Sequence, residues 1–249
     1  NRINYLKKLK KVKIKIIVAQ ISILVCFFLI WELLGKKGLI NTFLFSYPSD
    51  IGKLFVDYLI DGTLFKHIGI SVAETMLGLL IGMGVGLLIA IIIWWNETFS
   101  RIIDPYLVVL NALPKTALAP IIIIWVGAGM KGIVCVAISI SLVLTIMSAS
   151  QYFKNVDLEK ILMLKSLGAT KFQILTKLII PANILNLISL VKINIGMSWV
   201  GVIVGEFIIS KEGIGYLIMY GSQIFKMSLV MMGVLVLSVL SFLMYEVVN

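Results

Sequence analysis

Long apolar stretches with few charges constrain the fold of this chain more than any other feature. They cover residues 14–34, 67–95, 105–125, 133–150, 178–204 and 227–248. A helix needs roughly 20 apolar residues to cross about 30 Å of hydrocarbon, and within lipid it satisfies its own backbone hydrogen bonds. We therefore predict an all-α, polytopic membrane protein with six transmembrane helices.

The composition and the charge distribution agree with this class. Hydrophobic residues make up 60% of the 249 positions and charged residues 14%, whereas soluble domains carry about 25% charged residues. Seven of the 22 basic residues fall in the first fifteen positions, so the net charge of +10 indicates contact with anionic lipid rather than with nucleic acid. Outside the spans, 13 Lys and Arg lie on the side of both termini and 7 on the other. This bias predicts a multi-pass protein of the cell membrane with cytoplasmic N- and C-termini.

One long segment between the fourth and fifth spans does not fit a membrane crossing. Asn155 is a possible N-cap, and Asp157 and Glu159 stand in the first turn, where the helix dipole favours negative charge. Lys165 lies in the last turn, and Gly168 supplies the positive φ that ends such a helix. The segment therefore predicts a short cytoplasmic helix followed by a glycine turn.

Apolar side chains surround this short helix almost completely. They are Leu158, Ile161, Leu162, Met163, Leu164 and Leu167. A helix that is apolar all round has to be buried on most sides. Two arrangements stay open: the helix packs only against its own spans, or a separate cytoplasmic protein covers what they leave exposed. Thr170 and Gln173 then form a capping box that starts the next helix.

The same segment resembles a known family, the permeases of bacterial ABC importers. Pro181 follows Gly168 by 13 positions, which is the spacing of the EAA loop of that family. Residues 104–129 and 190–206 resemble its nitrate, sulfonate and taurine branch, with thiamine-precursor and riboflavin permeases as close relatives. In the second run the matching positions are Lys192, Gly196, Trp199 and Glu206. The resemblance covers roughly residues 47–246.

In that family the loop is a coupling helix that sits in a groove of a separate ATPase subunit. The resemblance therefore implies an ATPase-coupling role for Asp157, Leu158, Glu159, Leu162, Lys165, Gly168 and Ala169. The chain departs from the family pattern at its defining glutamate, which falls on Leu162, while Met163 and Leu164 replace the alanines. Glu159 lies one turn earlier, and the sequence leaves open whether it substitutes.

The resemblance also implies the partners. They are cytoplasmic ATP-binding subunits that hold ATP and Mg, a second permease copy in a homodimer, an external substrate-binding protein and membrane lipid. The transported solute would be a sulfonate, taurine or nitrate-type anion, or a thiamine-precursor or riboflavin-type heterocycle. Glu74 stands where many sulfonate and taurine permeases have arginine. A glutamate at this position is more like the thiamine-precursor and riboflavin relatives.

We expect a translocation path to involve Glu74, Lys115, Ser189, Lys192 and Trp199. A charge inside a span is costly unless it faces a cavity or a partner. Lys192 should lie about 16 Å beyond Pro181, near the bilayer centre, with Ser189 and Trp199 on the same helix face. The alternative is that Lys192 pairs with Glu74 or with the backbone and only fixes helix packing.

No pattern for catalysis or metal binding is present. The sequence has no GxxxxGK[ST], HExxH, GxSxG or CxxC, a single His, and two cysteines, Cys26 and Cys135, in separate apolar segments. We therefore expect a transport subunit with no cofactor and no ATPase site of its own. A secondary transporter or channel is the alternative, and a membrane-embedded interaction protein would leave the charges within the spans unexplained.

The sequence also predicts how the chain is divided. Residues 1–65 would hold the basic N-terminus, the first span and an external amphipathic helix, and residues 66–249 the transport core. Ser49 or Asp50 would cap the external helix, and Gly62 would end it.

Glycines suggest two further features. Gly78, Gly82 and Gly86, spaced by four in the second span, predict close approach of another helix. Residues 207–226 are rich in glycine and are predicted to form an outer loop.

Overall fold

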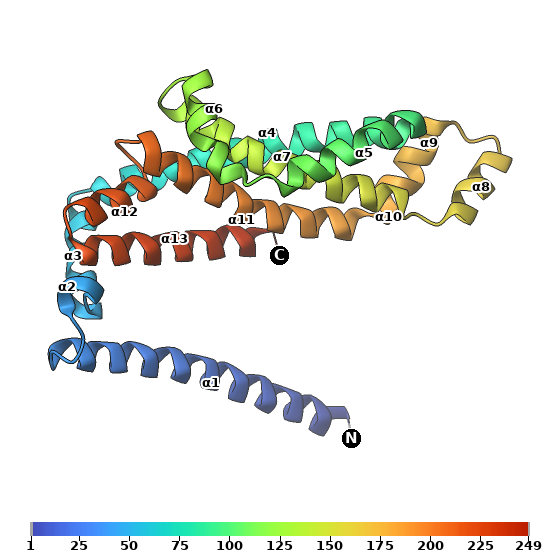
Figure 1. Ribbon diagram of the computed structural model, residues 1–249. Coiled ribbons are helices and arrows are strands. Elements are labelled where there is room, and N and C mark those ends of the chain that lie inside the picture. The colour runs from blue at the N-terminus through green and yellow to red at the C-terminus, as the bar shows by residue number, and fades with distance from the viewer. Residues whose placement is uncertain (1, 249) are drawn as a thin grey trace.

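The computed structural model describes residues 2–248 and is built from helices alone in that range (Figure 1), as predicted. The helices are α1 (Arg2–Lys36), α2 (Thr42–Phe45), α3 (Pro48–Ile60), α4 (Thr63–Trp95), α5 (Glu97–Ala112), a 3₁₀ turn (Lys115–Leu118), α6 (Ala119–Val126), α7 (Met130–Lys154), α8 (Leu158–Ser166), α9 (Lys171–Ile174), a π turn (Leu175–Ile179), α10 (Ile180–Ala182), α11 (Ile184–Ile209), α12 (Ile214–Gln223) and α13 (Met227–Val247).

Five of these helices are long and apolar enough to cross a membrane, and a sixth crossing exists only as a broken pair. The five are α1 from Ile14 onward, α4, α7, α11 and α13. The pair is α5 with the 3₁₀ turn and α6, which meet at an angle of 82°. The six predicted spans are thus recovered when the pair is counted as one span.

The bounds predicted for that third span, 105–125, are wrong. The helix begins at Glu97, because the Asn96 side chain caps it by accepting the backbone N–H of Phe99 at 3.1 Å. It ends at Ala112, just before Pro114, which has no backbone N–H to continue the helix. Pro120 causes no second kink, because it stands in the first turn of α6, where a proline is tolerated.

Helices α4, α7 and α11 form the centre of the bundle, and small residues set their separation. An added Cβ at Gly78 would lie 2.6 Å from the Cβ of Ala137, and one at Gly86 would lie 2.7 Å from Thr145 Cβ. An added Cβ at Gly201 on α11 would lie 2.5 Å from the Ala137 Cα. The glycine stripe therefore allows close helix approach, as predicted.

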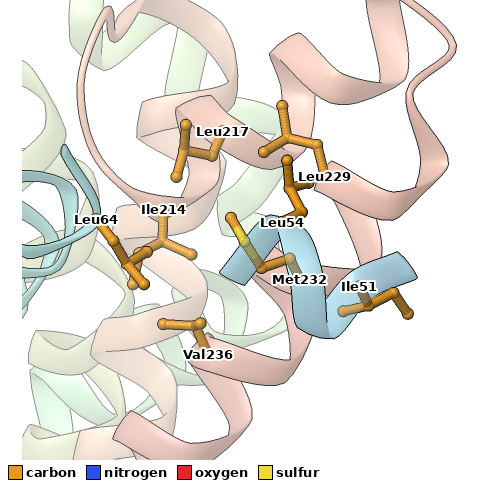
Figure 2. Close-up of a cluster of buried hydrophobic side chains, with 8 residues drawn as sticks. All are labelled: Ile51, Leu54, Leu64, Ile214, Leu217, Leu229, Met232 and Val236. Atoms are coloured by element: carbon orange, nitrogen blue, oxygen red, sulfur yellow. The ribbon is translucent and has the colours of Figure 1, made fainter. Parts of the chain in front are cut away.

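A buried apolar cluster joins α3, α4, α12 and α13 (Figure 2). Its members are Ile51, Leu54, Leu64, Ile214, Leu217, Leu229, Met232 and Val236. The predicted caps Ser49 and Asp50 are wrong, because α3 starts earlier, with Pro48 in its first turn. Helix α3 ends at Ile60, and Gly62, two residues later, has φ +73°.

The predicted outer loop at 207–226 is also wrong in part. Helix α11 continues to Ile209, and α12 forms a ten-residue helix that buries Ile214 and Leu217. The glycines here serve close packing as well as turns: an added Cβ at Gly221 would lie 3.1 Å from Leu229 and Val230.

Helix α1 stands apart from the rest of the bundle (Figure 1). None of its most apolar stretch is buried. It is tied to α3 at its C-terminal end, where Glu32 accepts hydrogen bonds from the Ser49 backbone N–H at 2.9 Å and hydroxyl at 2.7 Å. Trp31 Nε1 also donates to the Ser46 carbonyl at 3.2 Å.

Candidate coupling segment and translocation path

Helix α8 lies at the end of the molecule farthest from α12 (Figure 1). Its N-cap is Asp157, whose side chain accepts the Glu159 backbone N–H at 2.9 Å. The predicted cap, Asn155, is wrong: its N–H bonds to the Gln151 carbonyl at 3.0 Å, so Asn155 ends α7 instead. The helix therefore starts two residues later than a cap at Asn155 would place it.

The turn after α8 has the predicted geometry. Gly168 has φ +80°. The backbone N–H groups of Gly168 and Ala169 bond to the carbonyls of Lys165 and Leu164, each at 3.0 Å, which closes the helix. The Thr170–Gln173 capping box that follows is present, with both reciprocal hydrogen bonds formed.

The apolar surface of α8 is divided between a covered and an open side. Ile161 and Leu164 are half-buried against the cluster around Phe153 and Ile174. The open side carries large exposed side chains, with exposed fractions of 52–75% for Leu158, Leu162, Met163 and Leu167. The charged Glu159 and Lys165 are exposed beside them. The bundle thus covers only part of the helix.

Lys192 and Ser189 lie together on an open part of α11. Lys192 is half-buried, and its ammonium lies 5.1 Å from the centroid of the Tyr245 ring on α13. Ser189 is exposed and donates to the Leu185 carbonyl at 2.9 Å. Because Tyr245 belongs to the last turn of α13, Lys192 lies level with the end of that helix. The predicted depth of Lys192 near the bilayer centre stays a prediction.

Glu74 and Trp199 do not share this open surface. Glu74 is 2% exposed, and its carboxyl group contacts that of Glu206 on α11. The alternative Lys192–Glu74 pair is therefore not formed. Trp199 is 4% exposed and packs against Leu79.

Lys115 lies in the break between α5 and α6. Its ammonium donates to the backbone and side-chain oxygens of Asn111 at 3.2 and 3.3 Å. It thus satisfies a carbonyl that the interrupted helix leaves without a partner.

Glu206 is the polar residue that reasoning from the sequence did not assign to a role. It is 1% exposed and accepts hydrogen bonds from Ser71 and from the start of α12. The signal that could have identified it is the pair of glycines, Gly213 and Gly215, which leave room for a carboxylate near the backbone. Within residues 2–248, no three His, Cys, Asp or Glu side chains converge as metal ligands.

Comparison with known proteins identifies the family to which this chain belongs. The family model described as "Binding-protein-dependent transport system inner membrane component" matches residues 78–249. A protein of Bacillus subtilis (strain 168) named as an aliphatic sulfonates transport permease, SsuC, is 28% identical over 211 residues, which are 84% of this chain and 76% of that protein. The formylaminopyrimidine transport permease ThiX of Halalkalibacterium halodurans is 26% identical over 75% of this chain and 74% of its own length.

A taurine permease and a chain of a solved ABC transporter are also similar to this chain. The taurine transport permease TauC of Escherichia coli (strain K12) is 26% identical over 74% of this chain and 67% of its own length. This chain is also similar to a chain from an inward-facing structure of the MetNI methionine ABC transporter, with a TM-score of 0.65 and 15% identity. The match covers 75% of this chain and 96% of the MetNI chain and indicates a shared fold. The chain therefore belongs to the family of binding-protein-dependent transport system inner membrane components and is a permease subunit of an ABC transporter.

Proposed function

We propose that this permease imports a small organic solute, either a sulfonate, taurine or nitrate-type anion or a thiamine-precursor or riboflavin-type heterocycle. The names of its relatives support both classes, since they include sulfonate, taurine and formylaminopyrimidine permeases. We also propose that an external binding protein delivers the solute and that separate cytoplasmic subunits bind ATP and Mg.

The orientation in the membrane is part of this proposal. The end with α8 faces the cytoplasm together with both termini, because 13 Lys and Arg lie on that side and 7 on the other. Single cysteines at Asn155 and Gly62 test it with a membrane-impermeant thiol reagent applied to intact cells. Labelling of Gly62→Cys alone supports the orientation, and labelling of Asn155→Cys from outside contradicts it.

The open side of α8 carries the proposed contact with the ATP-binding subunits. The proposed coupling residues are Asp157, Leu158, Glu159, Leu162, Lys165, Gly168 and Ala169. Two exposed leucines, Leu158 and Leu162, offer apolar surface, and exposed charges flank them. An apolar surface rimmed by charges is typical of a protein interface.

The broken pair of α5 and α6 supports a second permease copy. A helix break cannot face lipid, because its freed backbone groups need protein or water. Asn111 and Thr116 beside the break are also exposed in the single chain. We propose that a second copy in a homodimer covers this side and that the path runs between the copies.

Within that path, the observation that carries the proposal is the position of Lys192. It is the one basic residue of α11, lies eight residues inside that helix, and shares an open surface with Ser189. Lys115 would lie on the path at the helix break. Glu74 and Trp199 are buried one layer behind, so we propose that they support the wall of the path from within the bundle.

The test compares Lys192→Met with wild type in liposomes that contain the complete transporter. We expect normal assembly and basal ATP hydrolysis but reduced uptake of the solute, because the substitution keeps the aliphatic stem and removes the charge. Lys131→Met, at the exposed start of α7, is the matched control. Uptake equal to wild type would remove Lys192 from the path, and failure of assembly would assign it to helix packing.

A further inference from the structure

The backbone N–H groups at the start of α12 are all bound by side chains from other helices. Gly213 N–H donates to His67 Nδ1 at 2.9 Å, and Ile214 N–H donates to Ser71 Oγ at 2.8 Å. The next two, Gly215 and Tyr216, donate to Glu206 Oε2 at 2.5 and 3.3 Å. The first N–H groups of a helix lack partners within the helix and carry its positive dipole end. Here α4 and α11 supply those partners.

The sequence around this helix start leaves space for one carboxylate. An added Cβ at Gly213 would lie 2.4 Å from the carboxyl group of Glu206, and one at Gly215 would lie 2.8 Å from Glu206 Oε2. Gly213 also has φ +107°, which residues with a side chain rarely adopt. The two glycines therefore let Glu206 reach the backbone of α12.

Hydrogen bonds to Glu206 show which form of its carboxyl group the site accommodates. One oxygen accepts the Ser71 hydroxyl at 2.5 Å, and the other accepts the two N–H groups of α12. An ionised carboxylate is an acceptor only, and it is stabilised by several donors and by a helix N-terminus. The surroundings of Glu206 thus suit the charged form.

Glu74 has the opposite surroundings. It is 2% exposed, its carboxyl group contacts that of Glu206, and its Oε2 atom has no hydrogen-bond partner among the described residues. Two carboxylates in contact repel each other, and charge at a buried site is costly without a partner. Because Glu74 Oε2 has no donor among the described residues whereas Glu206 has three, a proton placed on Glu74 turns this repulsive contact into a hydrogen bond to Glu206.

Other ionisable groups nearby do not replace that proton. His67 accepts at Nδ1 from Gly213 and stacks on Tyr216, with ring centroids 5.9 Å apart. Lys66 forms its ion pair with Glu212. The ion pairs found among the described residues include neither Glu74 nor Glu206.

We propose that Glu74 and Glu206 form a buried proton-binding site that holds one proton, carried by Glu74. In this arrangement Glu74 donates to ionised Glu206, and Glu206 fixes the first turn of α12 to α4 and α11. The consequence reaches the apolar cluster of Figure 2, because Ile214 and Leu217 enter that cluster from α12. The pair thereby positions the segment that connects α11 with α13.

Infrared difference spectroscopy tests the protonation directly on the purified full-length permease in lipid nanodiscs. A protonated carboxyl group has a C=O stretching band above the amide I region, and this band shifts in D₂O. We expect the wild-type minus Glu74→Gln spectrum to contain such a band, equivalent to one carboxylic acid per chain. Glu212→Gln, an exposed carboxylate on the adjoining turn, is the control and should leave the band in place.

Three results would overturn the proposal. The first is the absence of a carboxylic acid band from the wild-type minus Glu74→Gln spectrum. The second is a band that survives Glu74→Gln but disappears in Glu206→Gln, because the proton would then belong to Glu206. The third is a band that appears only when Na⁺ and K⁺ are replaced by choline, because a metal cation would then occupy the site.

Hydrogen exchange at the amides of Gly215 and Tyr216 tests the positioning role. Glu74→Gln keeps a donor toward Glu206 and should leave the exchange of these amides unchanged. Glu206→Ala removes their acceptor, and we expect exchange there to accelerate about tenfold or more, without a similar change in α7. Unchanged exchange in Glu206→Ala would contradict the role assigned to the pair. Accelerated exchange in Glu74→Gln would contradict it as well.

Discussion

Helices α1 and α7 have the same mean hydropathy in their most apolar stretches, yet they are packed in opposite ways. In α7, 61% of that stretch is buried within the chain, and in α1 none of it is. Within a membrane, apolar side chains gain little by leaving lipid for protein, so hydropathy alone does not bring helices together. Small residues do so in α7, where Ala137 lies against Gly78 and Gly201. Hydropathy therefore identifies a span, while small residues on matching faces identify its neighbours.

The largest difference between the two helices should appear when a large side chain is shortened. Ile133 on α7 is 1% exposed, and Ile23 on α1 is 71% exposed. We expect Ile133→Ala to lower the free energy of unfolding by about 2–5 kcal/mol, because it leaves a cavity. Ile23→Ala should change it by less than about 0.5 kcal/mol, as for a surface substitution. Thermal or denaturant unfolding in detergent measures both, and equal effects would break the comparison.

A smaller effect is expected when a methyl group is added between α4 and α7. Gly78→Ala would place a Cβ 2.6 Å from that of Ala137, which cannot rotate away. Overpacking of this kind costs about 1–3 kcal/mol. Gly84→Ala is the control on the same helix, because an added Cβ there meets nothing within 4 Å. It should stabilise the helix by up to about 1 kcal/mol. The same unfolding measurement should therefore give opposite signs.

Substitution of Gly168, which lies outside the core, should be destabilising for a different reason. An added side chain at Gly168 meets nothing within 4 Å, but its φ of +80° strains any residue with a Cβ. Gly168→Val should cost roughly 1–2 kcal/mol, confined to the turn after α8. The expected result is a membrane-inserted permease with weak substrate-stimulated ATP hydrolysis by its partner subunits.

Gly168→Asn is the control for that experiment, because asparagine tolerates the left-handed region better than other residues. It should retain most of the stimulated hydrolysis. Wild-type hydrolysis in Gly168→Val would show that the geometry of this turn does not affect coupling.

The smallest effect is expected where α1 meets α3. Glu32→Gln weakens the hydrogen bonds to Ser49 and the ion pair with Lys36 at the exposed end of α1. We expect no measurable change in global unfolding, because α1 contributes little to the buried core. Spin labels on α1 and α3 should instead report a broader distance distribution. A lower unfolding midpoint would show that α1 supports the bundle more than its exposure indicates.

Local chain chemistry made several features predictable. The spans follow from apolar length, the turn at Gly168 from its place after a helix, and the break before Pro114 from the missing backbone N–H. Predictions of helix starts were less successful, because neighbouring residues compete to cap. Asp157 is the cap of α8 where Asn155 was predicted, and both are good cap residues.

Contacts between distant segments were not predictable in this way. The partner of Glu74 could have been Lys192, since opposite charges attract, but helix packing places Glu206 there instead. Likewise, the glycines of 207–226 are typical of a loop. Their close packing against Leu229 and Glu206, which explains why a helix forms here, is seen only in the tertiary structure.

The sequence by itself determined the membrane class, the number of crossings when the broken pair counts as one, and the turn that ends α8. These depend on transfer of side chains to lipid and on backbone geometry, which are properties of short stretches of chain. Only the tertiary structure decided that α1 stays exposed while α7 is buried, and that Glu206 caps α12 with Ser71, 135 residues away in sequence. Such contacts depend on the helix faces that meet when the whole bundle is assembled, which no short stretch of sequence specifies.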